Sequence, residues 1–231
     1  IDLKFLNSKN KENVINYKDT KIFYENGISV DIDKANNLIR IDQQKIGSRV
    51  YISNGKLENI SIVFNGIKPP PDENSNTYIP PNYPINQRGL TGCISFINIY
   101  FDYVDLTANN SNCEDAINLV NTAGKINTIS IQNSFSDALD ADFSELKINN
   151  LNISSAINDC TDFSAGKYDL INLDLNNCGD KGISIGEKSK VKIKNITVNK
   201  ADIGVATKDS SILSLKNASL KNLRTCVSAY N

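Results

Sequence analysis

Small residues recur at intervals of 22 through the second half of the sequence, and this repeat limits the fold more than any other feature. The repeated positions are Ala116, Ala138, Cys160, Gly182, Gly204 and Cys226. The position after each of them is apolar in five of the six cases. A fixed period of this length is typical of a solenoid, in which every repeat forms one coil and stacks on its neighbours.

A second motif, apolar-x-x-apolar-x-apolar, comes before each small residue, and its spacing lengthens once from 22 to 23 between Leu170 and Ile193. Segments such as "LKINNLNIS" and "VKIKNITV" alternate apolar and polar residues, which indicates strands. We therefore predict an all-β fold, a right-handed parallel β-helix with about 22 residues per coil. Equivalent residues would then stack about 4.8 Å apart.

A leucine-rich repeat shares the period but needs a Leu/Asn consensus and a helix or turn segment that are absent here. Asn133, Asn177 and Asn199 are expected in one column, as an Asn ladder at a turn.

The start of the chain is less regular. Residues 1–50 contain strand-like pieces at uneven spacing and are expected to form early coils or a cap over the end of the solenoid. Residues 51–231 are expected to form the β-helix, in one continuous domain. Because the chain starts at Ile1, with no charged and apolar leader after it, we expect a fragment of a longer protein.

All six prolines fall in "KPPPDENSNTYIPPNYP", which cannot form a central strand. We expect residues 67–92 to be a loop inserted between two coils. Loops of this length often line a site. Tyr78, Tyr83 and Arg88 are therefore candidate sugar-contacting residues, and a cap or an oligomer contact is the alternative. The oligomeric state stays open.

Composition excludes several classes of chemistry. The sequence has no His, so His-based triads and His-ligated metals are excluded. Its five Cys contain no CxxC pair, which argues against zinc, and we expect them to be small buried residues with at least one free thiol. A net charge of −1 argues against nucleic acid as a partner, and no apolar run approaches the roughly 20 residues of a membrane span.

Aspartates are concentrated in two adjacent repeats, at the same 22-residue interval. Asp137 and Asp159 share one position of the repeat, and Asp140 and Asp162 share another. Since side chains alternate along a strand, Asp140 and Asp142 should point away from the core. Two carboxylates about 5 Å apart repel each other by roughly 3 kcal/mol at an effective dielectric constant of 20.

Something must therefore compensate this repulsion. Lys181, one repeat after Asp159, could neutralise part of it. A calcium ion could bind between Asp140 and Asp162, or one Asp could stay protonated, as a general acid must. The arrangement predicts a site rather than a merely solvated strand.

Four motifs on successive repeats resemble those of polygalacturonases, the inverting pectin hydrolases of the pectin-lyase-like β-helix superfamily. "SDALD" lies where that family has "NTDG", "NDCTDFS" resembles "DDC", "GDKGISIG" resembles "GHGISIG", and "GVATK" lies where the family has "GVRIK". The resemblance covers about residues 130–210. It matches Asp137, Asp159 and Lys208 to residues of the family's motifs, whereas Asn158, Lys181 and Ala206 replace the Asp, His and Arg found there.

We therefore expect a carbohydrate-active protein whose Asp-lined groove binds or cleaves a polysaccharide, secreted or on a cell surface. The candidate catalytic residues are Asp137, Asp159, Asp140 and Asp162. The candidate substrate-binding residues are Lys181, Lys208, Asn118, Asn158, Asp142, Tyr78, Tyr83 and Arg88.

The spacing leaves the chemistry open. Carboxylates one coil apart suit a retaining glycosidase, and a diagonal pair such as Asp140 and Asp159 suits an inverting one. A calcium-dependent lyase would need a Lys base, but neighbouring Asp residues raise the pKa of a Lys such as Lys181. The alternative is a non-catalytic β-helix that binds a glycan or a protein partner.

Overall fold

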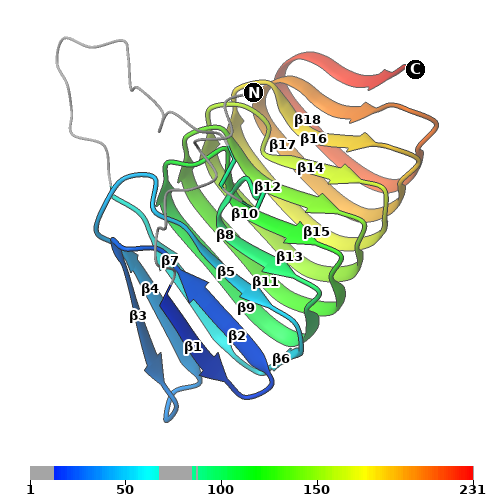
Figure 1. The fold of residues 1–231 in the computed structure, drawn as a ribbon. Coiled ribbons are helices and arrows are strands. Elements are labelled where there is room, and N and C mark those ends of the chain that lie inside the picture. The colour runs from blue at the N-terminus through cyan, green and yellow to red at the C-terminus, as the bar shows by residue number, and fades with distance from the viewer. Residues whose placement is uncertain (1–12, 68–84, 87, 231) are drawn as a thin grey trace, which may run out of the picture.

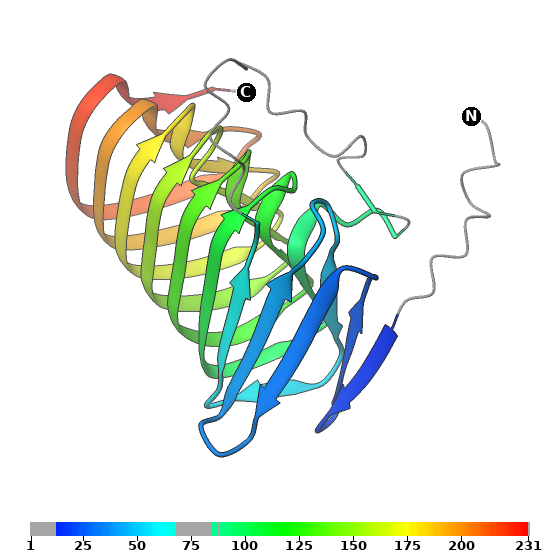
Figure 2. The ribbon, with the colours of Figure 1, turned by 90° about the vertical axis from the view of Figure 1, so that its left-hand side faces the viewer.

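The computed structural model describes residues 13–67, 85–86 and 88–230, and these residues form 18 strands and no helix. The chain winds into a parallel β-solenoid whose coils, or rungs, stack side by side (Figure 1, Figure 2). The predicted parallel β-helix is thus confirmed. The expected loop at 67–92 lies mostly outside the described residues, and Tyr78 and Tyr83 lie outside them too.

Each rung contributes a short strand to one sheet, which we call the short-strand sheet. Its strands are β5 (Val50–Ser53), β8 (Gly92–Ile97), β10 (Asp115–Val120), β12 (Asp137–Asp142), β14 (Thr161–Ser164) and β16 (Lys181–Gly186). Neighbouring strands pair in parallel, and Leu139 lies between Ile117 and Thr161 in register. The 22-residue interval is therefore the length of one rung, as the repeat predicted.

Each short strand is followed by a long one. The long strands are β9 (Tyr100–Ser111), β11 (Ala123–Ser134), β13 (Glu145–Ala156), β15 (Lys167–Cys178), β17 (Lys190–Thr207) and β18 (Ile212–Ala229). In the first rung the long strand is divided into β6 (Lys56–Glu58) and β7 (Ser61–Asn65), and β9 pairs with both. From β9 to β15, a long strand covers two sides of the solenoid and a short strand covers the third. The last long strands, β17 and β18, also continue into the short-strand sheet, where β17 pairs with β16.

The core fills the inside of the solenoid with columns of apolar side chains, one residue per rung. Ile148, Leu170 and Ile193 form one such column and are at most 2% exposed. Burial of an aliphatic side chain of this size stabilises the fold by about 1.5 to 3 kcal/mol. The column also confirms the single 23-residue step, because Leu170 pairs with Ile193.

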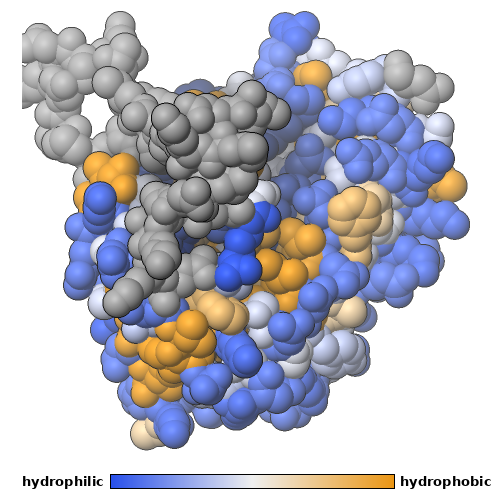
Figure 3. All heavy atoms as spheres, viewed as in Figure 1, coloured by the Kyte–Doolittle hydropathy of each residue, from blue (hydrophilic) through white to orange (hydrophobic). Residues whose placement is uncertain are grey.

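Antiparallel strands lie at the N-terminal end of the solenoid. They are β1 (Asn13–Tyr17), β2 (Thr20–Tyr24), β3 (Ile28–Asp33) and β4 (Leu38–Gln43). β1 pairs with β2, β2 with β5 and β3 with β4, each in antiparallel orientation, while β4 joins β7 in parallel. Hydrophobic side chains gather on the surface over these strands, whereas the neighbouring solenoid surface is mostly hydrophilic (Figure 3).

Two disulfides connect neighbouring parts of the solenoid. Cys93 pairs with Cys113, and Cys160 pairs with Cys178, whereas Cys226 is free and exposed. The four paired residues are at most 3% exposed. The expected burial is therefore confirmed for these four residues and wrong for Cys226, which is the expected free thiol.

Candidate functional site

The outward side of the short-strand sheet carries one continuous column of polar residues. In chain order this column, the Asp140 column, contains Tyr51, Ser95, Asn118, Asp140, Asp162, Ser184 and Ala206. Asp140 and Asp142 alternate with the fully buried Leu139 and Ala141, so they point away from the core as predicted. The register brings the predicted Asp140 and Asp162 directly beside each other.

Carboxyl groups gather around this column, and we call Asp115, Asp137, Asp140, Asp142, Asp159 and Asp162 the acidic cluster. Burial, together with the charges of Asp115, Asp142 and Asp162, raises the pKa of Asp140 to about 9. The amide of Asn118 donates a hydrogen bond of 3.1 Å to Oδ2 of Asp140. Asp140 therefore holds a proton at neutral pH.

Asp142 lies two residues further along the same strand, and its Cα pairs with that of Ser164 in the next rung. Burial raises its pKa, and the charges of Glu187 and Asp162 act in the same direction. The carboxyl of Asp140 and the amide of Asn118 oppose this effect by hydrogen bonding. Asp142 thus shares its environment with Asp140 rather than with solvent.

Asp115 was not among the predicted site residues, although it shares its position in the repeat with Asp137. It is only 3% exposed, and burial raises its pKa to about 8, with Asp137 and Glu114 acting in the same direction. The signal that could have identified it was the shared column. What the sequence did not reveal was its burial.

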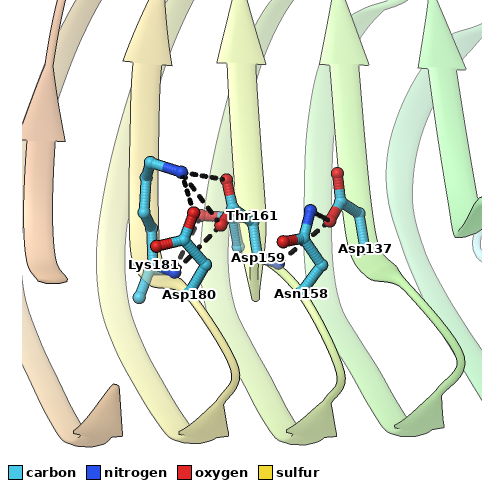
Figure 4. A network of polar contacts seen from close by, with 7 residues as sticks. Asp137, Asn158, Asp159, Thr161, Asp180 and Lys181 are labelled. Carbon is cyan, nitrogen blue, oxygen red and sulfur yellow. Dashed lines mark hydrogen bonds and ion pairs between the residues drawn. The ribbon is translucent and has the colours of Figure 1, made fainter. Parts of the chain in front are cut away.

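Asp137 and Asp159 have a different environment, because each accepts hydrogen bonds from the following rung (Figure 4). Oδ1 of Asp137 accepts from Nδ2 of Asn158 at 2.7 Å and from the backbone N–H of Asp159 at 2.9 Å. Oδ1 of Asp159 accepts from the backbone N–H of Lys181 at 2.9 Å. These two carboxyls, both predicted to be catalytic, thus help to hold successive rungs together. Asn158, predicted to bind substrate, acts here as a partner of Asp137.

Lys181 lies one rung beyond Asp159 and ends the row that Asp137 and Asp159 begin (Figure 4). Its ammonium group lies 3.4 Å from Oδ2 of Asp159 and forms a shorter ion pair with Asp180. Burial disfavours the Lys181 charge, but the hydrogen bond to Asp180 and the charge of Asp159 raise its pKa overall. Burial raises the pKa of Asp159 to about 6, although Lys181 opposes that shift. The ammonium group is therefore held by carboxylates of its own chain.

The remaining predicted residues lie at the two ends of the same surface. The Arg88 guanidinium stacks 4.9 Å from the ring centre of Tyr51, the residue that begins the Asp140 column, and 5.7 Å from that of Phe23. Lys208 follows the last paired residue of β17 and lies beside Gly186. The structure thus places Arg88 and Lys208 beyond either end of the acidic cluster.

Several buried polar atoms along this surface have no hydrogen-bond partner. They are Oγ of Ser95, Oδ2 of Asp115, Oδ1 of Asp162 and Oγ of Ser184. Ser95 and Ser184 are at most 1% exposed and lie at the two ends of the run Asn118–Asp140–Asp162 in the Asp140 column. Because buried polar groups are normally satisfied, these atoms indicate a missing partner along the column.

In the described part of the chain, no three acidic or Cys side chains are grouped so as to hold a metal ion. The calcium site predicted at Asp140 and Asp162 therefore has two carboxylates from adjacent rungs, and it stays a prediction. No helix that could cross a membrane is present among the described residues.

A groove lies on another side of the solenoid, along the C-terminal halves of the long strands. Its volume is about 380 Å³, and Ser, Asn, Gln and Asp side chains from four successive rungs line it. Gln132 and Ser154 are typical of this lining. The groove contains one acidic residue, Asp174, so it differs in charge from the acidic cluster.

Comparison of the chain with protein-family models, with curated proteins and with solved structures finds no match. The similarity to polygalacturonases is therefore one of short motifs and their order. What the chain does must be argued from the fold and from the side chains described above.

Proposed function

We propose that the protein binds an extended polysaccharide along the Asp140 column and hydrolyses it. The observation that carries this proposal is the row of unsatisfied polar atoms that runs from Ser95 to Ser184. These two residues are four rungs apart, which corresponds to about 19 Å. A chain of sugars offers hydroxyl groups over such a length, and each hydroxyl both donates and accepts hydrogen bonds.

Asp140 and Asp162 are the pair that we assign to the chemistry. Asp140 is protonated at neutral pH because of its burial and its acidic neighbours, and so can act as a general acid. Asp162 is one rung away, about 4.8 Å along the solenoid axis. That distance is close to the roughly 5 to 5.5 Å between the two carboxyls of retaining glycosidases.

The reaction follows from these roles. A carboxylate oxygen of Asp162 forms a bond to the anomeric carbon while the bond to the leaving sugar breaks and its oxygen takes the proton of Asp140. Asp140, now ionised, then removes a proton from water, and the water oxygen displaces Asp162 from the anomeric carbon. The product sugar keeps its anomeric configuration. A lyase is less well supported, because the pKa of Lys181 is raised and its ammonium group is a poor base.

The test is release of reducing ends from a panel of polysaccharides by the wild-type protein and by Asp140→Asn and Asp162→Asn variants. Each substitution should lower the rate by about 10² to 10⁴-fold. Asp169→Asn, on an exposed position of β15 outside the acidic cluster, is the matched control and should keep full activity. Products of inverted configuration, or full activity of Asp140→Asn, would contradict the assignment.

A second candidate is a non-catalytic glycan-binding solenoid. It is favoured by the hydrogen bonds of Asp137 and Asp159 to the next rung, which give these carboxyls a structural role. This candidate predicts binding of an oligosaccharide without release of reducing ends. Both candidates agree with secretion or display on a cell surface, because the two disulfides persist best in an oxidising compartment.

A further inference from the structure

The charges around the Asp140 column are almost all negative. The groups that raise the pKa of Asp140 after its burial are all carboxyls, namely Asp115, Asp142, Asp162 and Asp137. Glu114 acts on Asp137 and Glu187 acts on Asp142 in the same direction. The cluster therefore repels a further negative charge and attracts a positive one.

The cations that the described residues place nearby already have partners. Lys181 is bound to Asp159 and Asp180. Arg49 donates a hydrogen bond of 2.6 Å from Nη1 to the carbonyl of Leu90, and its charge interacts with those of Glu25, Asp115 and Glu114. Among the described residues, the charges that act most strongly on Asp140 itself are all carboxyls.

The unsatisfied atoms give a second and independent indication of a ligand. Ser95, Asp115 and Ser184 are at most 3% exposed, and each keeps one side-chain oxygen without a hydrogen-bond partner. A carboxyl oxygen without a proton accepts hydrogen bonds, so Oδ2 of Asp115 and Oδ1 of Asp162 can each take a donor from a ligand. An ammonium group supplies three donors together with a positive charge.

We propose that the polysaccharide bound along the Asp140 column is a cationic amino-sugar polymer, whose free ammonium groups contact the carboxyl groups of Asp115, Asp142 and Asp162. This inference rests on the proposed function, because it names the substrate of the same surface. It gives Lys181 and Lys208, predicted from the sequence to bind substrate, no part in holding the ammonium groups. A polyuronate would bring its carboxylates against those of the acidic cluster, whereas an amine-bearing chain brings the opposite charge.

Binding of three defined hexamers tests the proposal by calorimetry: fully deacetylated glucosamine, fully N-acetylated glucosamine and galacturonate. The deacetylated hexamer should bind at least about tenfold more tightly than the N-acetylated one, because each charge-assisted hydrogen bond to a carboxylate adds affinity. Its affinity should fall as salt is raised. Asp162→Asn should weaken it about tenfold, whereas the control Asp169→Asn should leave it unchanged.

A second measurement does not depend on how well a variant folds. An ammonium group favours the ionised form of the carboxyls that it contacts, so binding of the deacetylated hexamer should release protons. Calorimetry in two buffers of different ionisation enthalpy measures this release. The N-acetylated hexamer has no such charge and should release none.

The outcomes separate this inference from the proposed function. Equal affinity for the two glucosamine hexamers, or tighter binding of galacturonate, overturns the inference. If a neutral hexamer is bound and cleaved in a reaction that needs Asp140, the proposed function stands while the inference fails. If none of the hexamers binds and no polysaccharide is cleaved, both are overturned.

Discussion

At the scale of single residues, the acidic cluster contains carboxyls of two kinds. Asp137 and Asp159 each accept a backbone N–H from the next rung, and these donors favour the ionised form. For Asp140 and Asp115, burial and the surrounding carboxyls raise the pKa values to about 9 and about 8. The first kind stabilises the solenoid, and the second kind is the one suited to act on a ligand.

Asp140 should therefore make folding stability depend on pH. Its pKa rises from 3.8 in the unfolded chain to about 9 in the fold, so between these values only the folded protein keeps the proton. Its contribution is fully present below pH 3.8 and is lost as the pH rises towards 9. Asp140→Asn removes this loss and should increase the free energy of unfolding at pH 8 by on the order of a few kcal/mol, with little change at pH 4.

Denaturant unfolding of both proteins at pH 4, 6 and 8 measures the effect. Asp169→Asn provides the control for loss of a negative charge, and it should follow the wild-type curve. A variant that is as stable as the wild type at all three pH values would show that Asp140 is not protonated in the fold. A gain in stability together with a loss of activity would mean that the site is maintained at the expense of stability.

At the scale of strands, the corner at the C-terminal end of β9, β11, β13 and β15 depends on one backbone position, and β17 and β18 continue through the same corner. In these six rungs the corner is occupied by residues with positive φ, namely Asn110, Asn133, Ser155, Asn177, Lys200 and Asn222. The Asn ladder predicted from the sequence was right for Asn133 and Asn177 and wrong for Asn199. The 23-residue step moves Lys200 into the corner, and Asn199 pairs with Asn176 instead.

A separate ladder was missed, on the same long strands. Nδ2 of Asn172 donates to Asn150, Asn195 donates to Asn172, and Asn217 donates to Asn195. Its members are 22, 23 and 22 residues apart in the sequence, but Asn is so frequent in this chain that the spacing alone did not distinguish this column. Only the paired strands identify it.

Ser155 is the position at which the corner can be improved. Its φ is 72°, a region that Asn tolerates better than other non-glycine residues and that β-branched residues disfavour. Ser155→Asn should therefore stabilise the protein by a few tenths of a kcal/mol, roughly the gain expected from a compatible turn residue. Ser155→Val should cost about 1 to 2 kcal/mol. Thermal unfolding of the two variants measures the difference, and a Val variant as stable as the Asn variant would refute this account of the bend.

At the scale of the whole molecule, a solenoid is held together by contacts between neighbouring rungs. Stability in such a fold is close to a sum of rung and interface contributions. The two disulfides act within this scheme as local constraints, since each closes a loop of only 18 or 20 residues. Loss of one disulfide should therefore destabilise its own rungs more than the rest of the solenoid.

Replacing Cys160 and Cys178 together by Ala should lower the free energy of unfolding by about 3 kcal/mol, the value expected for a loop of this length. Cys226→Ala is the matched control, because Cys226 is unpaired, and it should change stability by less than about 0.5 kcal/mol. Hydrogen exchange should accelerate mainly in β14 to β16. If exchange accelerated equally in β5 and β8, stability could not be a sum of contributions from separate rungs and their interfaces.

The sequence by itself determined the fold and its register. Every rung must bury an apolar column, and a shift of one residue would turn that column towards solvent, so the interval of 22 fixes which residues become neighbours. The stacking of Asp137 on Asp115, and of Asp162 on Asp140, follows from that interval alone.

The tertiary structure decided the chemistry of those neighbours. Burial, the direction of hydrogen bonds and the pairing of Lys181 depend on how separate rungs pack, which no local pattern encodes. Asp137 and Asp140 are three residues apart and look alike in the sequence. Only the assembled solenoid gives one of them backbone N–H donors and surrounds the other with acids, because the free energy of a charge depends on its three-dimensional environment.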